Sequence, residues 1–299
     1  MAVYIMEDVT LKEIDTIKSH IPVIYNIGFN SIQFSFKYDF INKNTDYNEY
    51  LKKCKEILDE IKKYSWKHLL LKVAHVSNFQ ELESESYLNM YKVFLEKLII
   101  DLQDYDFTII SISNEAGELT SSKYTDFWVD VIQNVRKVYS GLITMSPQLY
   151  EIVNIKFLDK LDVIGCNIYP SICYREDYNK VLYSNFFDNF SLGANLRYLE
   201  GLTKRYNKPL FILECGCQPY KDRLANPGES ALKSTLDNDA QTVYYKIALP
   251  TLELVDFING YFIWEGNGTG SYDPFYKGRE KTKKFIEEFM ERIENEQYN

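Results

Sequence analysis

Histidine is scarce in this chain, and metal chemistry that depends on histidine ligands is correspondingly hard to build. The only histidines are His20, His68 and His75. No two of them stand in the HxH or HExxH spacing that brings imidazoles onto one metal ion. The sequence therefore argues against a catalytic zinc site or a two-metal hydrolase, and we expect an activity that needs no metal or other cofactor.

Cysteine is also too sparse to form a framework. The five cysteines are scattered, and they match neither a disulfide pattern nor a paired zinc-ligand pattern. Cys215 and Cys217 do not have the redox C-x-x-C spacing. Residues 1–10 carry Glu7 and Asp8 where a secretion signal would have a basic start and a longer apolar centre. Reduced thiols and this N-terminal composition favour a cytoplasmic protein.

Long apolar runs and basic runs are missing as well. No apolar segment approaches the length of a membrane span. The net charge of -9 is not offset by any cluster of lysine or arginine. Nucleic acid and anionic membrane surfaces are therefore poor candidate partners.

Short apolar segments of strand character do recur, with helical segments between them. The expected strands lie at residues 1–6, 31–36, 68–74, 108–113, 141–146, 161–168, 209–214 and 260–264. Apolar residues at helical spacing follow most of them, as at Leu51, Cys54, Ile57 and Ile61. No glycine-rich dinucleotide turn follows the first strand. The pattern predicts an α/β fold of one eight-stranded barrel, a TIM barrel, in a single domain over residues 1–299.

Two of these expected strands end in a glutamate. Residues 209–213 are apolar and lead into Glu214, and residues 108–113 lead into Asn114 and Glu115. The carboxyl ends of all strands in a parallel barrel face one mouth. We therefore expect Glu115 and Glu214 to meet there, although they are far apart in the sequence.

A pair of carboxyl groups at one mouth suits the hydrolysis of glycosidic bonds. Retaining glycosidases place two such groups about 5–5.5 Å apart, one to attack the anomeric carbon and one to protonate the leaving oxygen. A single strand-end acid more often caps a helix or pairs with lysine. Two such acids on the fourth and seventh expected strands favour the catalytic interpretation.

Several segments also resemble a known family. Asn114-Glu115 and Glu214, at two strand ends, are similar to the signature of the retaining glycosidases of clan A. Glycoside hydrolase family 113, the β-mannanase-like family, is resembled most closely. The resemblance covers most of the chain in order, through the segments at residues 28–32, 71–76, 161–170, 208–214 and 260–265.

The resemblance implies a role for each of several residues. Glu115 would be the acid/base and Glu214 the nucleophile. The others would bind an oligosaccharide or polysaccharide: Asn114 at the hydroxyl beside the reacting carbon, Tyr169 near the nucleophile, Trp264 under the sugar, His75 at the rim, and Asn167 in the segment that carries Tyr169. An aromatic face complements the apolar face of a pyranose. The alternative is a purely structural role for each: Trp264 packs in the barrel core, Tyr169 packs at the rim, and His75 is a hydrogen-bonded core residue.

The sequence departs from the resembled pattern at identifiable positions. Many clan members carry an arginine near the end of the second strand, where this chain has Gln33. Family 113 typically has proline before the histidine of the third strand and threonine before the acid/base, where this chain has Ala74 and Asn114. These departures leave the two-carboxylate chemistry in place and leave the sugar open.

Two other functions share the same fold. A non-catalytic carbohydrate-binding barrel would keep the mouth and dispense with a carboxylate, but both glutamates are present. A transglycosylase would use the same two glutamates and pass the sugar to an acceptor other than water. We expect the chain to be a hydrolase of β-glycosidic bonds, with β-mannosides among the substrates to test.

Overall fold

Eight parallel strands form the inner wall of the molecule. The computed structural model describes residues 2–5, 14–38, 46–74, 84–174, 177–181, 190–228, 235–264 and 273–297. The strands of the wall are β1 (Ala2–Ile5), β2 (Ser31–Lys37), β3 (His68–Ala74), β4 (Ile109–Asn114), β5 (Leu142–Ser146), β6 (Ile164–Asn167), β9 (Leu210–Cys215) and β10 (Ile258–Ile263). They pair in the order β5-β4-β3-β2-β1-β10-β9-β6, each parallel to its neighbours.

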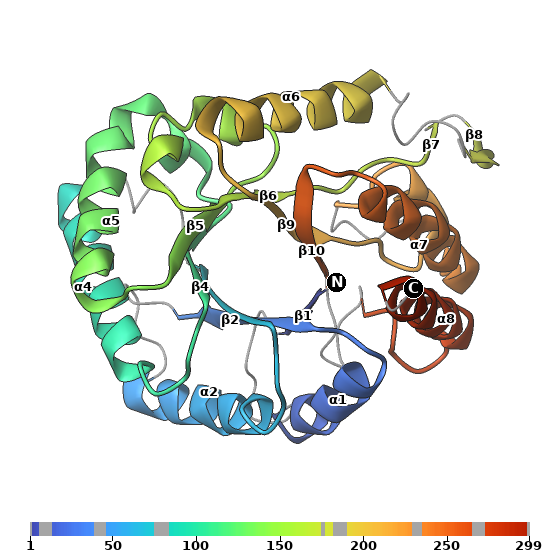
Figure 1. The fold of residues 1–299 in the computed structure, drawn as a ribbon, viewed down its shortest axis with the longest axis horizontal. Helices are drawn as coiled ribbons and strands as arrows, with labels where there is room; N and C mark the ends of the chain where they lie inside the picture. The colour runs from blue at the N-terminus through green and yellow to red at the C-terminus, as the bar shows by residue number, and fades with distance from the viewer. Residues whose placement is uncertain are drawn as a thin grey trace.

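The two end strands of this order, β5 and β6, lie beside each other. The backbone nitrogen of Asp162 donates to Ile143 O at 2.9 Å, and that of Asn167 donates to Pro147 O at 2.8 Å. Gln148 and Asn167 also form a parallel bridge. The strands therefore form a ring, as Figure 1 shows, and the predicted TIM barrel is confirmed.

Helices cover the outside of this ring (Figure 1). They are α1 (Ile14–Asn26), α2 (Tyr47–Ile61), α4 (Glu85–Asp101), α5 (Thr125–Val138), α6 (Phe190–Tyr206), α7 (Asn238–Glu253) and α8 (Glu280–Gln297). α2 shows how the sequence specifies such a helix. The side chain of Asp46 accepts from Glu49 N at its N-terminus, and its buried face carries Cys54, Ile57 and Ile61.

The connections after β5 and β6 are less regular. Between β5 and β6 the chain forms only the short 3-10 helices η3 (Ile152–Asn154) and η4 (Leu158–Lys160). After β6 an antiparallel pair, β7 (Cys173–Tyr174) and β8 (Asp177–Val181), precedes α6. The short 3-10 helix η5 (Lys221–Leu224) follows β9. These insertions lie after the carboxyl ends of strands, where the mouth of the barrel forms.

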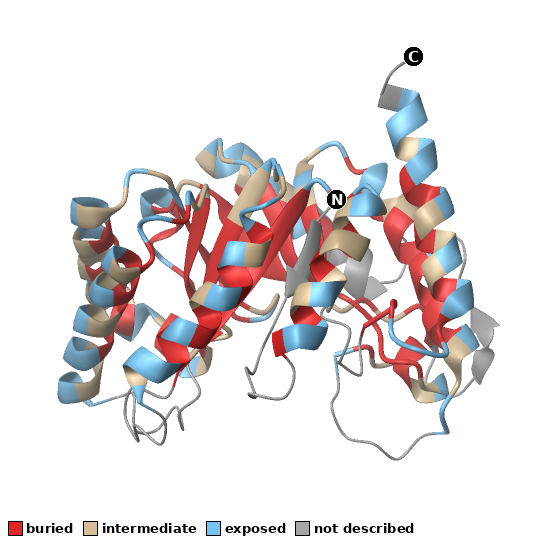
Figure 2. Cartoon of the chain, turned by 90° about the horizontal axis from the view of Figure 1, so that it is seen from below, coloured by how far each residue is buried: buried red, intermediate tan, exposed pale blue. Residues whose placement is uncertain are grey.

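The buried apolar residues that pack together form two separate groups. The larger one lies between the strands and the inner faces of the helices, and Figure 2 shows burial concentrated on the strands and exposure on the outer faces of the helices. The smaller one, which we call the inner apolar layer, consists of Leu70, Ile109, Val163, Phe211, Leu213 and Phe262. Within the described ranges, no helix has the length and hydropathy needed to span a membrane.

Candidate active site

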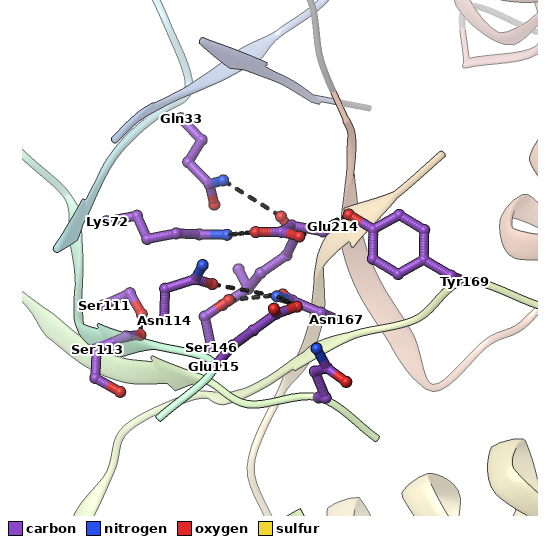
Figure 3. A network of polar contacts seen from close by, with 12 residues as sticks. Gln33, Lys72, Ser111, Ser113, Asn114, Glu115, Ser146, Asn167, Tyr169 and Glu214 are labelled. Carbon is purple, nitrogen blue, oxygen red and sulfur yellow. Dashed lines mark hydrogen bonds and ion pairs between the residues drawn. The ribbon is translucent and has the colours of Figure 1, made fainter. Parts of the chain in front are cut away.

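A shift in strand pairing turns Glu214 into the barrel. Phe211 and Leu213 belong to the inner apolar layer, so strict alternation along β9 would turn the next residue outward. The pairing with β6 slips between Cys166↔Ile212 and Asn167↔Glu214, and the pairing with β10 is also irregular at this point. Such irregularities re-aim side chains. Glu214 is thus 3% exposed and points into the barrel interior (Figure 3).

Both carboxylate oxygens of Glu214 accept hydrogen bonds. The ammonium of Lys72, on β3, donates to Oε1 at 2.5 Å. The hydroxyl of Tyr169, just after β6, donates to Oε2 at 2.6 Å. The two donors approach from opposite sides of the carboxylate (Figure 3). Side chains from β3 and from the end of β6 therefore hold this group in one orientation.

The surroundings of Glu214 act on its pKa in opposite directions. Burial raises the pKa of the Glu214 carboxyl to about 7. The charge of Glu115 raises that pKa as well, whereas the Lys72 ammonium and the Tyr169 hydroxyl lower it. The ionised form is therefore stabilised by its hydrogen-bond partners, and at neutral pH the group lies close to its titration point.

Glu115 occupies a strained position immediately after β4. Its φ is +43°, in the left-handed region that non-glycine residues adopt rarely and at a cost of about 1–3 kcal/mol. The backbone nitrogen of Glu115 donates to Ser146 O at 2.8 Å. Its side-chain Oε1 accepts from Asn167 Nδ2 at 3.0 Å. The turn thus directs the second carboxylate toward the same interior as Glu214 (Figure 3).

Asn167 connects the side chains of Asn114 and Glu115 at the end of β4. Its Nδ2 also donates to Asn114 Oδ1 at 3.2 Å. Its Oδ1 accepts from the hydroxyl of Ser146, on β5, at 2.6 Å. One buried amide therefore bridges three strands, and it fixes the orientation of Asn114 and Glu115 together.

Trp264, immediately after β10, lies beside Lys72. The indole is 6% exposed, and Lys72 Nζ lies 5.7 Å from its ring centroid. A side chain at Gly216 would place its Cβ 2.4 Å from Trp264 O, so glycine is required for the close approach of β9 and β10. His75 lies outside the described residues. The structure thus brings together six of the seven predicted site residues: Asn114, Glu115, Asn167, Tyr169, Glu214 and Trp264.

Three residues at the site, Lys72, Ser146 and Glu151, were not identified from the sequence. Lys72 is fully buried, and a lysine within an apolar parallel strand is a signal that could have found it, because buried lysines require a partner. Ser146 carries no comparable signal. Gln33, at the position where the resembled clan has arginine, instead donates to the backbone of Leu213 at 3.3 Å. The cation beside Glu214 therefore comes from β3.

Glu151 is the third missed residue, and it is a buried carboxylate near Glu115. It is 2% exposed. Its oxygens accept from Gly117 N at 2.6 Å and Gln148 N at 2.8 Å. Burial raises the pKa of Glu151 to about 6, and the charge of Glu115 adds to this effect. Because both oxygens bind backbone amides, Glu151 anchors the turn that carries Glu115.

This arrangement supplies the parts of acid/base and nucleophilic chemistry on a sugar. One carboxylate is buried, oriented and paired with a cation, which suits a group that must attack while ionised. A second carboxylate, that of Glu115, comes from the end of another strand and points toward the same barrel interior. Amide groups and an aromatic ring surround the two, and such groups bind hydroxyls and the apolar face of a pyranose.

Comparison of the sequence with models of known protein families gives a match. Residues 104–280, more than half of the chain, match the model of Glycoside Hydrolase Family 113. None of the curated protein sequences compared with the chain matches it.

Comparison with solved structures shows the same fold. A GH113 β-1,4-mannanase superposes with a TM-score of 0.78 at 17% identity, over 97% of this chain and 98% of the other. The GH113 β-mannanase AaManA from Alicyclobacillus acidocaldarius, in complex with ManMIm, superposes with a TM-score of 0.76 at 16% identity, over 98% and 96%. A β-D-glucuronidase from Dictyoglomus thermophilum gives 0.67 at 17% identity, over 97% of this chain and 50% of the other. At these identities the likeness is one of fold.

Proposed function

The chain belongs to glycoside hydrolase family 113, and from this premise we propose that it cleaves β-glycosidic bonds with retention, using Glu214 as nucleophile and Glu115 as acid/base. Family membership supports glycoside hydrolase activity on a carbohydrate substrate. The observation that carries the finer assignment is the buried carboxylate of Glu214. It is held by Lys72 and Tyr169, and Glu115 lies near enough to influence its pKa.

The proposed reaction has two steps. In the first, an oxygen of Glu214 forms a bond to the anomeric carbon while the glycosidic bond breaks, and Glu115 gives its proton to the leaving oxygen. In the second, Glu115 takes a proton from water as the water oxygen attacks the anomeric carbon. The bond from the anomeric carbon to Glu214 breaks in the same displacement, and its electron pair returns to the carboxylate. Two inversions at one carbon leave the configuration unchanged.

The remaining residues of the site would bind the sugar. We assign Asn114 to the hydroxyl beside the reacting carbon, with Asn167 keeping Asn114 in place through the bond at 3.2 Å. Trp264 is assigned to the face of the pyranose and Tyr169 to the orientation of Glu214. His75, which the resemblance implies at the rim, completes the proposed set. The β-mannosides are the substrates to test first, because the neighbouring structures of this family are β-mannanases.

The first experiment is a substrate panel with matched variants. Wild type and Glu115→Ala are assayed on activated aryl β-glycosides and on β-mannan, glucan, xylan and galactan oligosaccharides. We expect Glu115→Ala to lose about 10²–10⁴-fold on unactivated oligosaccharides and far less on activated glycosides, which need no protonation of the leaving group. Glu118→Ala is the control, because Glu118 lies three residues further along on the short 3-10 helix η1 (Gly117–Thr120) and is exposed.

The products distinguish the proposal from its rivals. Proton NMR of the first product formed should show the β-anomer, and an α-anomer would contradict retention. Transfer of the sugar to an added acceptor in preference to water would identify a transglycosylase. Tight binding of an oligosaccharide with no turnover by wild type would identify a binding barrel, and equal losses for Glu115→Ala on both substrate types would remove Glu115 as the acid.

A further inference from the structure

Lys72 is an unusual residue for the inside of a barrel. Its side chain is fully buried, and its register partners on β2 and β4 are the small residues Ser35 and Ser111. Burial of an unpaired ammonium is costly. Its ammonium forms an ion pair with the carboxylate of Glu214, 142 positions away in the sequence. The placement of this lysine is therefore tied to the carboxylate that the proposed function makes the nucleophile.

The two oxygens of Glu214 are held from different directions. Lys72 is inaccessible and bonds Oε1 from within the barrel wall. Tyr169 is partly exposed and bonds Oε2 from the strand end that faces the mouth. Figure 3 shows these two donors on opposite sides of the carboxylate. Because a sugar enters from the mouth, Oε2 is the oxygen that it can reach.

We infer that Lys72 is a positioning residue that holds Oε1 of Glu214 through both steps of the reaction and leaves Oε2 to bond the anomeric carbon. This inference rests on the proposed function. In the first step the bond from Oε2 to the anomeric carbon forms, and Oε1 becomes the carbonyl oxygen of the glycosyl ester. Lys72 remains bonded to that oxygen, because the ammonium already contacts Oε1 before attack.

The charge of Lys72 acts differently on the two steps. During the first step the negative charge of Glu214 disappears, so the ion pair weakens as the transition state forms. During the second step the carboxylate leaves the sugar and its charge returns, so the ion pair strengthens. Only an interaction that is stronger in the transition state speeds a step. Lys72 therefore keeps Glu214 ionised before attack and accelerates its departure afterwards.

The pH dependence follows from the groups that face Glu214. Among the described residues these are Lys72 from β3, Tyr169 after β6 and Glu115 after β4. Lys72 and Tyr169 lower the pKa of Glu214, and Glu115 raises it. Loss of the Lys72 charge removes the larger of the two lowering influences. The pKa of Glu214 then rises, and activity that needs the ionised carboxylate is lost at a higher pH.

The test compares Lys72→Met with Lys72→Arg in the full chain. The methionine keeps length and packing without charge, and the arginine keeps the charge. On an activated aryl glycoside, for which the second step limits turnover, we expect Lys72→Met to lose about tenfold or more in kcat, with a fall in KM as the glycosyl-enzyme accumulates. Its acid limb in kcat/KM should move up by about one pH unit, and Lys72→Arg should keep the acid limb of wild type.

A second measurement isolates the second step. The enzyme is trapped with an activated 2-deoxy-2-fluoro glycoside of the sugar that the panel identifies, and intact mass follows the reactivation of the labelled protein. Lys72→Met should reactivate about tenfold more slowly than wild type. If Lys72→Met does not fold, Lys72→Gln replaces it, because the amide is polar and carries no charge.

The outcomes separate this inference from the proposed function. If Lys72→Met lost kcat and kcat/KM equally at every pH and reactivated at the wild-type rate, its role would be structural. That result would overturn this inference and leave the proposed function standing. An unchanged pH profile in a folded Lys72→Met would overturn it as well. A wild type that neither turns over nor is labelled by any glycoside of the panel would remove the proposed function, and this inference with it.

Discussion

The interior of the barrel has two layers that come from the same strands and differ in chemistry. The inner apolar layer is built from residues such as Leu70 on β3, Ile109 on β4 and Phe211 on β9. The layer nearer the mouth is polar, and we call it the upper polar layer. It consists of Gln33, Ser35, Lys72, Ser111, Ser113, Thr144, Ser146, Asn167 and Glu214, all of which are buried.

The two layers differ in how they contribute to the free energy of folding. Burial of aliphatic and aromatic side chains stabilises the fold in proportion to the area removed from water. Burial of polar side chains costs free energy unless they are hydrogen-bonded. The upper polar layer offsets part of this cost with bonds such as Ser146 to Asn167 and Lys72 to Glu214. One layer therefore stabilises the barrel, and the other holds chemically competent groups in fixed positions.

The largest expected effect falls on the upper polar layer, in Glu214→Gln. The substitution keeps the shape of the side chain but removes the proposed nucleophile, so we expect kcat to fall by about 10⁴-fold or more. The measurement is turnover of the best substrate of the panel, with circular dichroism to establish that the barrel is intact. Near-normal activity in a folded Glu214→Gln would falsify the assignment of the nucleophile.

A change in the inner apolar layer should have the opposite character. Ile109 is fully buried, and Ile109→Ala is expected to lower the free energy of unfolding by about 2–5 kcal/mol. The kcat of the folded protein should remain near that of wild type. Urea denaturation and turnover at low temperature measure the two quantities. Val93→Ala is the control, since Val93 on α4 is 66% exposed and its loss should change stability by less than about 0.5 kcal/mol.

The smallest expected effect is a shift in pH dependence. Burial raises the pKa of Glu214 to about 7, so kcat/KM should fall as the pH drops through that value and the carboxylate takes up a proton. Tyr169→Phe removes a hydrogen bond to the ionised form, which should raise the pKa of Glu214 further and move the acid limb upward by less than about one pH unit.

The control for this shift is Tyr150→Phe, because Tyr150 follows β5 and is 67% exposed. An acid limb that moves equally in both variants would assign the shift to a general change in the mouth. A limb that moves down in Tyr169→Phe would contradict the contact between the phenol and Glu214 as the source of the effect.

The sequence alone predicted much of the fold because its apolar segments have the length and spacing of buried strands and covering helices. Residues 209–214 and 108–113 were expected as strands and correspond to β9 and β4. These features are local, so neighbouring residues are enough to indicate them.

The candidate site was less predictable, because its residues depend on long-range contacts. The glutamates could be found because each ends an apolar strand. The sequence could not show that Lys72 pairs with Glu214, because nothing in the residues around either one points to the other. Glu151 looked like one acid among many, and only the fold shows that it anchors the turn after Glu115 through Gly117.

What the sequence by itself determined is the order of strands and helices and the placement of two carboxylates at strand ends. Both follow from the periodicity of apolar residues and from where that periodicity stops. Only the tertiary structure decided that a register shift turns Glu214 inward and that Lys72 and Tyr169 take one oxygen each. The physical reason is that strand pairing and ring closure bring together side chains whose separation in the chain carries no information about their distance in space.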